Sequence, residues 1–131
     1  MKKILKRLLL ILVAVFFSIV ALMTAVLYPK LSNMKSEYVT AGVIGDLQKY
    51  VETNQGRWPT SWNDLGNGAD LSQFTRFRFD LSSADILRNP EIIYQAVTPV
   101  SGKYYTYPHA RQQLGEILNT IQEKNTNGKS P

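Results

Sequence analysis

Residues 8–27 read LLLILVAVFFSIVALMTAVL, twenty residues without a charged side chain and with only Ser18 and Thr24 as polar interruptions. As a helix that rises 1.5 Å per residue, this segment is about 30 Å long, which matches the hydrocarbon thickness of a bilayer. The remainder of a 131-residue chain is too short to cover every face of so apolar a helix. The sequence therefore predicts a transmembrane helix over residues 8–28.

The basic residues are unevenly distributed around this segment. The formal net charge is +5, and four of the basic side chains precede the apolar run: Lys2, Lys3, Lys6 and Arg7. Residues 28–131 are nearly neutral, with 11 basic and 10 acidic side chains, which argues against a nucleic-acid partner. The positive-inside rule makes residues 1–7 a cytoplasmic basic segment. We expect a single-pass protein of the inner (cytoplasmic) membrane whose domain, from about residue 30 onward, is periplasmic or extracellular.

A cleaved signal peptide is the alternative to a retained anchor. The apolar run is longer than the usual signal core of about 7 to 15 residues. Ala25 is preceded two positions earlier by Met23, so no clean small-residue cleavage site ends the run. Tyr28, Lys30 and Lys35 follow as an interfacial belt. These features favour a retained signal-anchor.

Small residues mark one face of the expected membrane helix. They are spaced three or four positions apart, as residues on one helix face are: Ala14, Ser18, Ala21 and Ala25. Helices pack in lipid mainly through close approach at such small residues. The expected partners are therefore membrane lipid and a homo- or hetero-oligomer formed through the transmembrane helix.

The exported part, residues 29–124, is predicted to form one α+β domain. Residues 29–54 have the period of an amphipathic helix, with Pro29 either opening it or bending a continuous one and Gly56 ending it. The positions expected to face the core of the domain are Leu31, Met34, Tyr38, Ala41, Ile44, Leu47 and Val51.

Shorter elements are expected after Gly56. Ser61 and Asp64 have the spacing of a capping box for one helical turn, and Ser82 or Ser83 is expected to cap another turn that ends at Leu87. Strict alternation of apolar and polar residues predicts a strand over residues 76–81. Asn89, Pro90 and Glu91 open a helix over residues 91–97.

The last third of the chain is expected to complete a small antiparallel sheet and a helix packed on it. Residues 98–102 read as a turn and residues 103–107, rich in tyrosine, as the second strand. A helix then begins at Pro108, and the polar residues 125–131 read as a disordered tail. The apolar positions of this helix are Ala110, Leu114, Ile117, Leu118 and Ile121.

Few residues suggest catalysis or ligand binding. The chain has no cysteine and one histidine, His109, without a nucleophile or carboxylate spaced to orient it. Asp64 and Asp70 flank a glycine loop but do not follow a calcium-loop pattern, so an ordinary loop is favoured. Arg76 and Arg78 share a strand face with Asp80, which favours cross-strand ion pairing over phosphate binding. We expect a non-enzymatic protein with no cofactor, metal or small-molecule substrate.

Aromatic residues are dense for so short a domain. A core of about 100 residues needs such bulk, so packing is the favoured interpretation. An aromatic surface that binds a partner is the other. The candidate partner-binding residues are Trp58, Trp62, Tyr104, Tyr105 and Tyr107.

The order of these features resembles the type IV pilin-like group, and especially the pseudopilins of type II secretion. In those proteins a membrane helix runs into an amphipathic helix, and a glycine, an aromatic, a proline, a hydroxyl residue and a later leucine mark the exit from it. Here that exit reads Gly56, Trp58, Pro59, Thr60, Ser61 and Leu65, and the resemblance covers residues 8–65. Residues 1–27 contain neither glycine nor an acidic residue, unlike pilin precursors. The resemblance implies a structural or assembly protein; an anchored accessory module that binds through its aromatic residues is the alternative.

Overall fold

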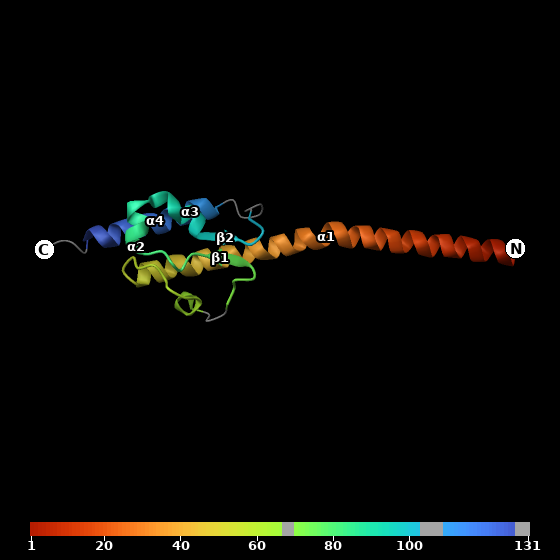
Figure 1. Cartoon of the computed structure of the whole chain (residues 1–131), viewed down its shortest axis with the longest axis horizontal. Coiled ribbons are helices and arrows are strands. Elements are labelled where there is room, and N and C mark those ends of the chain that lie inside the picture. The colour runs from red at the N-terminus through yellow and green to blue at the C-terminus, as the bar shows by residue number, and fades with distance from the viewer. Residues whose placement is uncertain (67–69, 103–108, 128–131) are drawn as a thin grey trace. The chain divides into compact units, whose positions relative to one another are not determined.

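The computed structural model describes residues 1–66, 70–102 and 109–127, which fall into two compact units, residues 1–33 and residues 34–131. The architecture is the α+β layout expected from the sequence, with a long apolar N-terminal helix, a two-stranded antiparallel sheet and a C-terminal helix (Figure 1). The elements are, in order, α1 Lys2–Thr53, η1 Trp62–Leu65, β1 Thr75–Phe77, α2 Ser83–Arg88, η2 Pro90–Ile92, α3 Ile93–Ala96, β2 Val97–Pro99 and α4 Ala110–Asn127.

The first unit is the N-terminal part of α1. The helix predicted for residues 8–28 is confirmed as a helix, and all of its side chains are exposed. Pro29 lies inside α1, so the helix continues through it rather than beginning there. Proline has no amide hydrogen to donate to the carbonyl four residues earlier, which leaves the carbonyl of Ala25 without its usual helical bond. One long helix thus replaces the two helices that a break at Pro29 would have given.

The core of the second unit lies between α1, α4 and the short elements. Trp58 from the segment after α1, Leu65 from η1 and Leu81 before α2 complete it. The predicted apolar face of the last helix is confirmed, since four of its five positions are buried and Leu118 packs against the core. The buried side chains from the helices and β2 are Val43, Ile44, Leu47, Val51, Ile86, Ile93, Ala96, Val97, Ala110, Leu114, Ile117 and Ile121.

The face that α1 buries differs from the predicted one at its beginning. Leu31, Met34 and Tyr38 are 62%, 50% and 82% exposed, whereas Ile44, Leu47 and Val51 are fully buried. A step of three residues turns an α-helix by about 300°, so each such step moves backwards by about 60° around the axis. Three successive steps separate Tyr38 from Leu47, which places them on opposite sides of α1. The seven predicted positions therefore never formed a single face.

Polar side chains replace apolar ones where α1 first enters the core. Ser36 and Thr40 are buried, and the Ser36 hydroxyl donates to the carbonyl oxygen of Phe74 at 2.5 Å. The hydroxyls of Thr40 and Thr75 lie 2.7 Å apart, and the Thr40 hydroxyl also lies 2.8 Å from the Ser36 carbonyl oxygen. These hydrogen bonds give the buried hydroxyl groups their partners, and they connect the start of β1 to α1.

The sheet is shorter than predicted, and its second strand is a different segment. β1 pairs with β2 in an antiparallel register, with Thr75 opposite Pro99 and Phe77 opposite Val97. The predicted turn at residues 98–102 is therefore partly wrong, because its first two residues belong to β2. The predicted strand over residues 103–107 lies outside the described residues. Although β1 has three residues, the alternation over residues 76–81 is confirmed, with the odd positions less exposed than the even ones.

The short helices follow their predicted caps. Ser82 caps α2 through a capping box with Asp85, and Pro90 begins η2, which leads directly into α3. Val97, predicted to end a helix, instead opens β2. In the last helix α4 extends to Asn127, so residues 125–127 are helical and do not belong to a disordered tail, while residues 128–131 lie outside the described part of the chain.

Candidate functional site

The exit from α1 positions the aromatic residues of the second unit. Gln55 and Gly56 both have positive φ, +57° and +76°, and the Gly56 amide donates to the Val51 carbonyl at 2.9 Å. This left-handed ending reverses the chain and satisfies one of the last helical carbonyls. A Cβ atom at Gly56 would lie 3.0 Å from the Cβ of Lys124, so any other residue at this positive φ would be strained against α4. The predicted role of Gly56 as the cap is confirmed.

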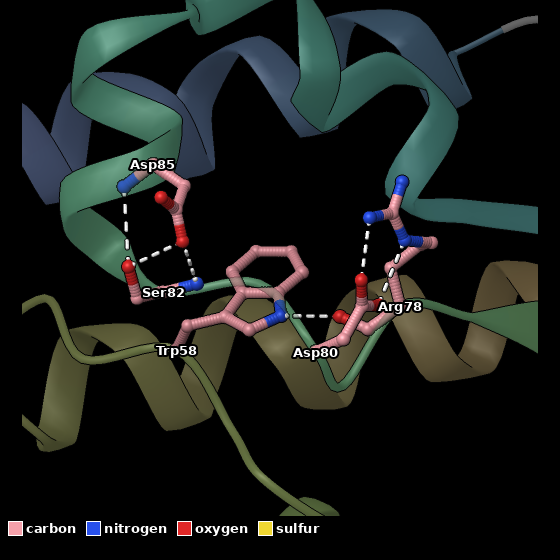
Figure 2. Close-up of polar contacts among 5 residues, drawn as sticks. All are labelled: Trp58, Arg78, Asp80, Ser82 and Asp85. Atoms are coloured by element: carbon pink, nitrogen blue, oxygen red, sulfur yellow. Dashed lines mark hydrogen bonds and ion pairs between the residues drawn. The ribbon is translucent and has the colours of Figure 1, made fainter.

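Trp58 leaves this turn and enters the core. Its side chain is only 5% exposed, and its ring stacks on Phe77 with centroids 5.4 Å apart. Its indole N–H donates to the carbonyl oxygen of Arg78 at 2.8 Å (Figure 2). A buried indole therefore has both an apolar environment and a partner for its single donor. For Trp58, the structure supports the packing interpretation.

Four aromatic rings form what we call the aromatic cluster: Trp58, Trp62, Phe77 and Phe79. Trp62, in η1, makes edge contacts with Phe77 and Phe79 at 5.8 Å and 5.0 Å, and these two phenylalanines stack at 4.3 Å. The side chains of all the members except Trp58 are half-buried. One edge of the cluster thus belongs to the core and the other reaches solvent.

Of the five residues of the predicted aromatic surface, the structure describes the two tryptophans. Both contact the ring of Phe77. Tyr104, Tyr105 and Tyr107 lie outside the described residues. Sequence reasoning assigned Phe77 and Phe79 to the inner face of a strand and did not count them as surface residues. Their spacing of two in the alternating segment was the signal available.

The polar groups beside Trp58 are held in local pairs, as Figure 2 shows. Arg78 donates to Asp80 from Nε at 2.7 Å and from Nη2 at 2.5 Å, an exposed bidentate ion pair. The hydrogen bonds from Arg78 lower the pKa of Asp80 below its ordinary value, and the same contact raises the pKa of Arg78. Ion pairing at this position was predicted, although it joins residues of the same segment and not of two strands.

The remaining acidic side chains near the site act as backbone caps. The Asp64 carboxylate accepts from the amide and hydroxyl of Thr60 at 2.7 Å and 2.9 Å and from the amide of Ser61 at 3.1 Å. The Thr60 bonds, ahead of those from Ser61, lower the pKa of Asp64. Asp70 accepts from Ser72, whose bonds lower the pKa of Asp70 in the same way. Among residues 1–66, 70–102 and 109–127, no group of three or more histidine, aspartate and glutamate side chains is arranged to hold a metal ion.

Open hollows lie on the second unit. One, of about 330 Å³, is lined by polar residues of α1 and by η1, including Asp46, Lys49 and Asp64. Another, of about 550 Å³, is mainly apolar and lies between α2 and α4 at Leu87 and Asn125. A third, of about 220 Å³, lies at the end of α1, beside Gln55 and Arg57.

The predicted packing face of the first unit lies on exposed helix. Ala14, Ser18, Ala21 and Ala25 fall within about 60° of one another around α1, from 100° per residue. The Ser18 hydroxyl donates to the Ala14 carbonyl at 2.9 Å, and the Thr24 hydroxyl donates to the Val20 carbonyl at 2.8 Å. The only two polar side chains of residues 8–27 are thus satisfied within the helix.

Comparison with protein-family models, with curated proteins and with solved structures finds no significant match to this chain. Its function is therefore argued from its own residues.

Proposed function

We propose that this chain is a non-enzymatic, single-pass membrane protein whose exported domain has a structural or assembly role like that of a pseudopilin. The observation that carries the proposal is the apolar half of α1. Residues 8–27 are helical, uncharged and exposed along their whole length, and none of the most apolar window is buried by the rest of the chain. In water such a surface is unfavourable, whereas a bilayer of matching thickness covers all of it.

The internal hydrogen bonds of this helix suit a bilayer. Lipid offers no partner to a polar group, so each must be satisfied within the protein. Ser18 and Thr24 meet this requirement through carbonyls one turn earlier. The carbonyl of Ala25, released by Pro29, lies near the end of the proposed span at residue 28, where water among the headgroups can reach it.

The distribution of charge supports the orientation. Lys2, Lys3, Lys6 and Arg7 precede the span, and positive residues are retained on the cytoplasmic side of a membrane. The second unit would then lie on the periplasmic or extracellular side of the inner membrane. The carboxylates beside its aromatic cluster are engaged in caps and an ion pair, which supports a role without catalysis.

The assembly role rests on α1 and on the resemblance to pseudopilins. In both, a membrane helix continues into the helix that fills the core of a small domain, and a glycine turn leads to an aromatic residue. Here Gly56 and Trp58 have these positions. The small residues between Ala14 and Ala25 offer the close approach on which helix packing in lipid depends.

Oligomeric state tests the assembly role. Full-length protein in mild detergent is expected to form oligomers, and Ser18→Phe with Ala21→Phe is expected to disrupt them by preventing close approach of the helices. Val13→Phe with Val20→Phe places two phenylalanines on another face of α1 and serves as the control. Residues 29–131 alone should remain monomeric in sedimentation. Dimerisation of this fragment at micromolar concentration, or a full-length monomer in every detergent, would contradict the proposal.

A second candidate function is favoured by the half-buried edge of the aromatic cluster. Trp62, Phe77 and Phe79 expose part of their rings together, and such rings are frequent binding residues at protein interfaces. The chain would then be an anchored extracytoplasmic module that binds a partner through this edge. A full-length monomer that loses partner binding on Trp62→Ala, without loss of stability, would favour this function over assembly.

A further inference from the structure

The first unit has a charge distribution that its own residues cannot neutralise. Residues 1–33 contain five basic side chains and no acidic one. Four of the five precede the apolar run, and Lys30 follows it. Cations without acidic neighbours within reach attract an anionic partner from outside the chain.

In the first two turns of α1, the basic and the apolar side chains lie on opposite faces of the helix. Lys3, Lys6 and Arg7 are exposed and lie within about 100° around the helix, because residues three and four apart share a face. The exposed side chains on the other side are Ile4, Leu5 and Leu8. A basic face opposite an apolar face is typical of helices at the boundary between lipid headgroups and acyl chains.

The length of α1 indicates the depth of this basic face. From Arg7 to Lys30 the helix rises about 35 Å at 1.5 Å per residue, which exceeds the hydrocarbon core of about 30 Å by a few ångströms. With residues 8–27 in the hydrocarbon, the cations on either side of it reach the headgroup layers. The groups at that depth that can pair with lysine and arginine are lipid phosphates.

We propose that the first two turns of α1 bind anionic phospholipid headgroups through Lys3, Lys6 and Arg7. The inference rests on the proposed membrane anchor and adds to it a lipid preference. Arg7 pairs with phosphate through its planar fork of donors, while Lys3 and Lys6 act as point charges on the same face. On the opposite face, the acyl chains contact Ile4, Leu5 and Leu8. Because the cations bind acidic headgroups, acidic lipid becomes enriched around the cytoplasmic end of the protein.

Lipid selectivity of the full-length protein tests this binding. The protein is reconstituted into phosphatidylcholine vesicles with a trace of spin-labelled phosphatidylglycerol or spin-labelled phosphatidylcholine, and the motionally restricted fraction of each label is measured. One interfacial cation favours an acidic lipid by about fivefold, so the preference for phosphatidylglycerol is expected to be about fivefold or more. It should decline toward one in 1 M salt, where the screening length is about 3 Å.

Two matched variants locate the effect. Lys3→Gln, Lys6→Gln and Arg7→Gln together are expected to lower the preference several-fold, although Lys2 and Lys30 remain. The control removes the same charge from exposed positions of the second unit, through Lys49→Gln, Arg57→Gln and Lys124→Gln, and should leave the preference unchanged. If the first variant does not insert, the salt dependence of the unsubstituted protein decides the question.

The possible failures are distinguishable. Retention in phosphatidylcholine vesicles without preference for the acidic lipid, or equal loss of preference in both variants, would overturn this inference and leave the anchor standing. A protein that is not retained in phosphatidylcholine vesicles would overturn the membrane anchor and this inference together.

Discussion

Trp58 is expected to contribute strongly to the stability of the second unit. Its ring is buried against Phe77, and its indole N–H donates to the carbonyl oxygen of Arg78. Trp58→Ala is expected to lower the free energy of unfolding by about 3 to 5 kcal/mol. Trp62 remains as a fluorescent probe within the same unit, so urea denaturation in detergent can be followed in the variant.

Trp58→Phe separates the two contributions. It keeps most of the apolar volume and removes the indole N–H that bonds to Arg78, so a loss of about 1 to 3 kcal/mol is expected. A loss below about 1 kcal/mol for Trp58→Ala would contradict the buried position of the ring, and it would shift the aromatic cluster toward a binding role.

Gly56 is the second residue whose identity the fold requires. Gly56→Ala would combine a positive φ with a Cβ contact at 3.0 Å on Lys124, so we expect it to destabilise the protein by about 1 to 3 kcal/mol. Gly66→Ala is the control for strain alone, because its φ is +92° and its Cβ would meet nothing within 4 Å. Gly45→Ala, in helix and in open space, should stabilise by about 0.5 to 1 kcal/mol.

The same urea titration measures all three glycine variants. Equal losses for Gly56→Ala and Gly66→Ala would mean that the contact with α4 contributes nothing. A loss for Gly45→Ala would contradict the exposed helical position assigned to that residue.

At the scale of single residues, the sequence predicted the caps well and the aromatic cluster only in part. Ser61 with Asp64, and Ser82 with Asp85, were identifiable because a capping box is local and has fixed spacing. Phe79 was not identified as a surface residue, since its half-buried position depends on its packing against Trp62 and Phe77. Local hydrogen bonding can be inferred from spacing, whereas partial exposure requires the tertiary structure.

At the scale of elements, the caps predict a dependence on pH. Hydrogen bonds from the hydroxyl and amide of Ser82 lower the pKa of Asp85 below its ordinary value of 3.8. A carboxyl with a lowered pKa in the folded state stabilises that state when ionised. This stabilisation is complete above the unfolded pKa and is lost as the pH falls through the folded pKa. The contributions of Asp64, Asp70 and Asp80 have the same sign.

Urea denaturation of the full-length protein at several pH values measures this effect. The contribution of these four carboxyls should be constant from about pH 7 to pH 5 and should decrease below the unfolded value of 3.8. Ser82→Ala removes the hydroxyl that holds Asp85 and is expected to make the decrease shallower. Asp85→Asn should do the same. If the free energy of unfolding decreases at low pH as steeply in both variants as in the unsubstituted protein, the role of this cap is contradicted.

The elements also show where periodicity misleads. The sequence correctly predicted helix over residues 8–53, because apolarity and helix-compatible spacing extend over many turns, while the predicted last residue, Asn54, lies just beyond the helix. It assigned the wrong face to Leu31, Met34 and Tyr38, because repeated steps of three rotate around the helix. It did not identify residues 97–99 as the partner of β1, since strand pairing is a non-local choice that three residues cannot specify.

For the whole chain, the proposal on which the others depend is that residues 8–27 span a membrane with the second unit outside the cytoplasm. The absence of cysteine from the sequence makes a direct measurement simple, because any thiol signal comes from an introduced residue. Three single substitutions sample the two sides and the middle of α1's proposed span: Lys3→Cys, Phe16→Cys and Arg57→Cys. All three native side chains are exposed on the isolated protein.

The measurement is labelling with a membrane-impermeant maleimide in intact spheroplasts, in permeabilised cells and after denaturation. The account predicts that Arg57→Cys reacts in intact spheroplasts, that Lys3→Cys reacts only after permeabilisation, and that Phe16→Cys reacts only after denaturation. Reaction of Phe16→Cys in the native protein, or of Lys3→Cys from outside while Arg57→Cys is protected, would contradict it.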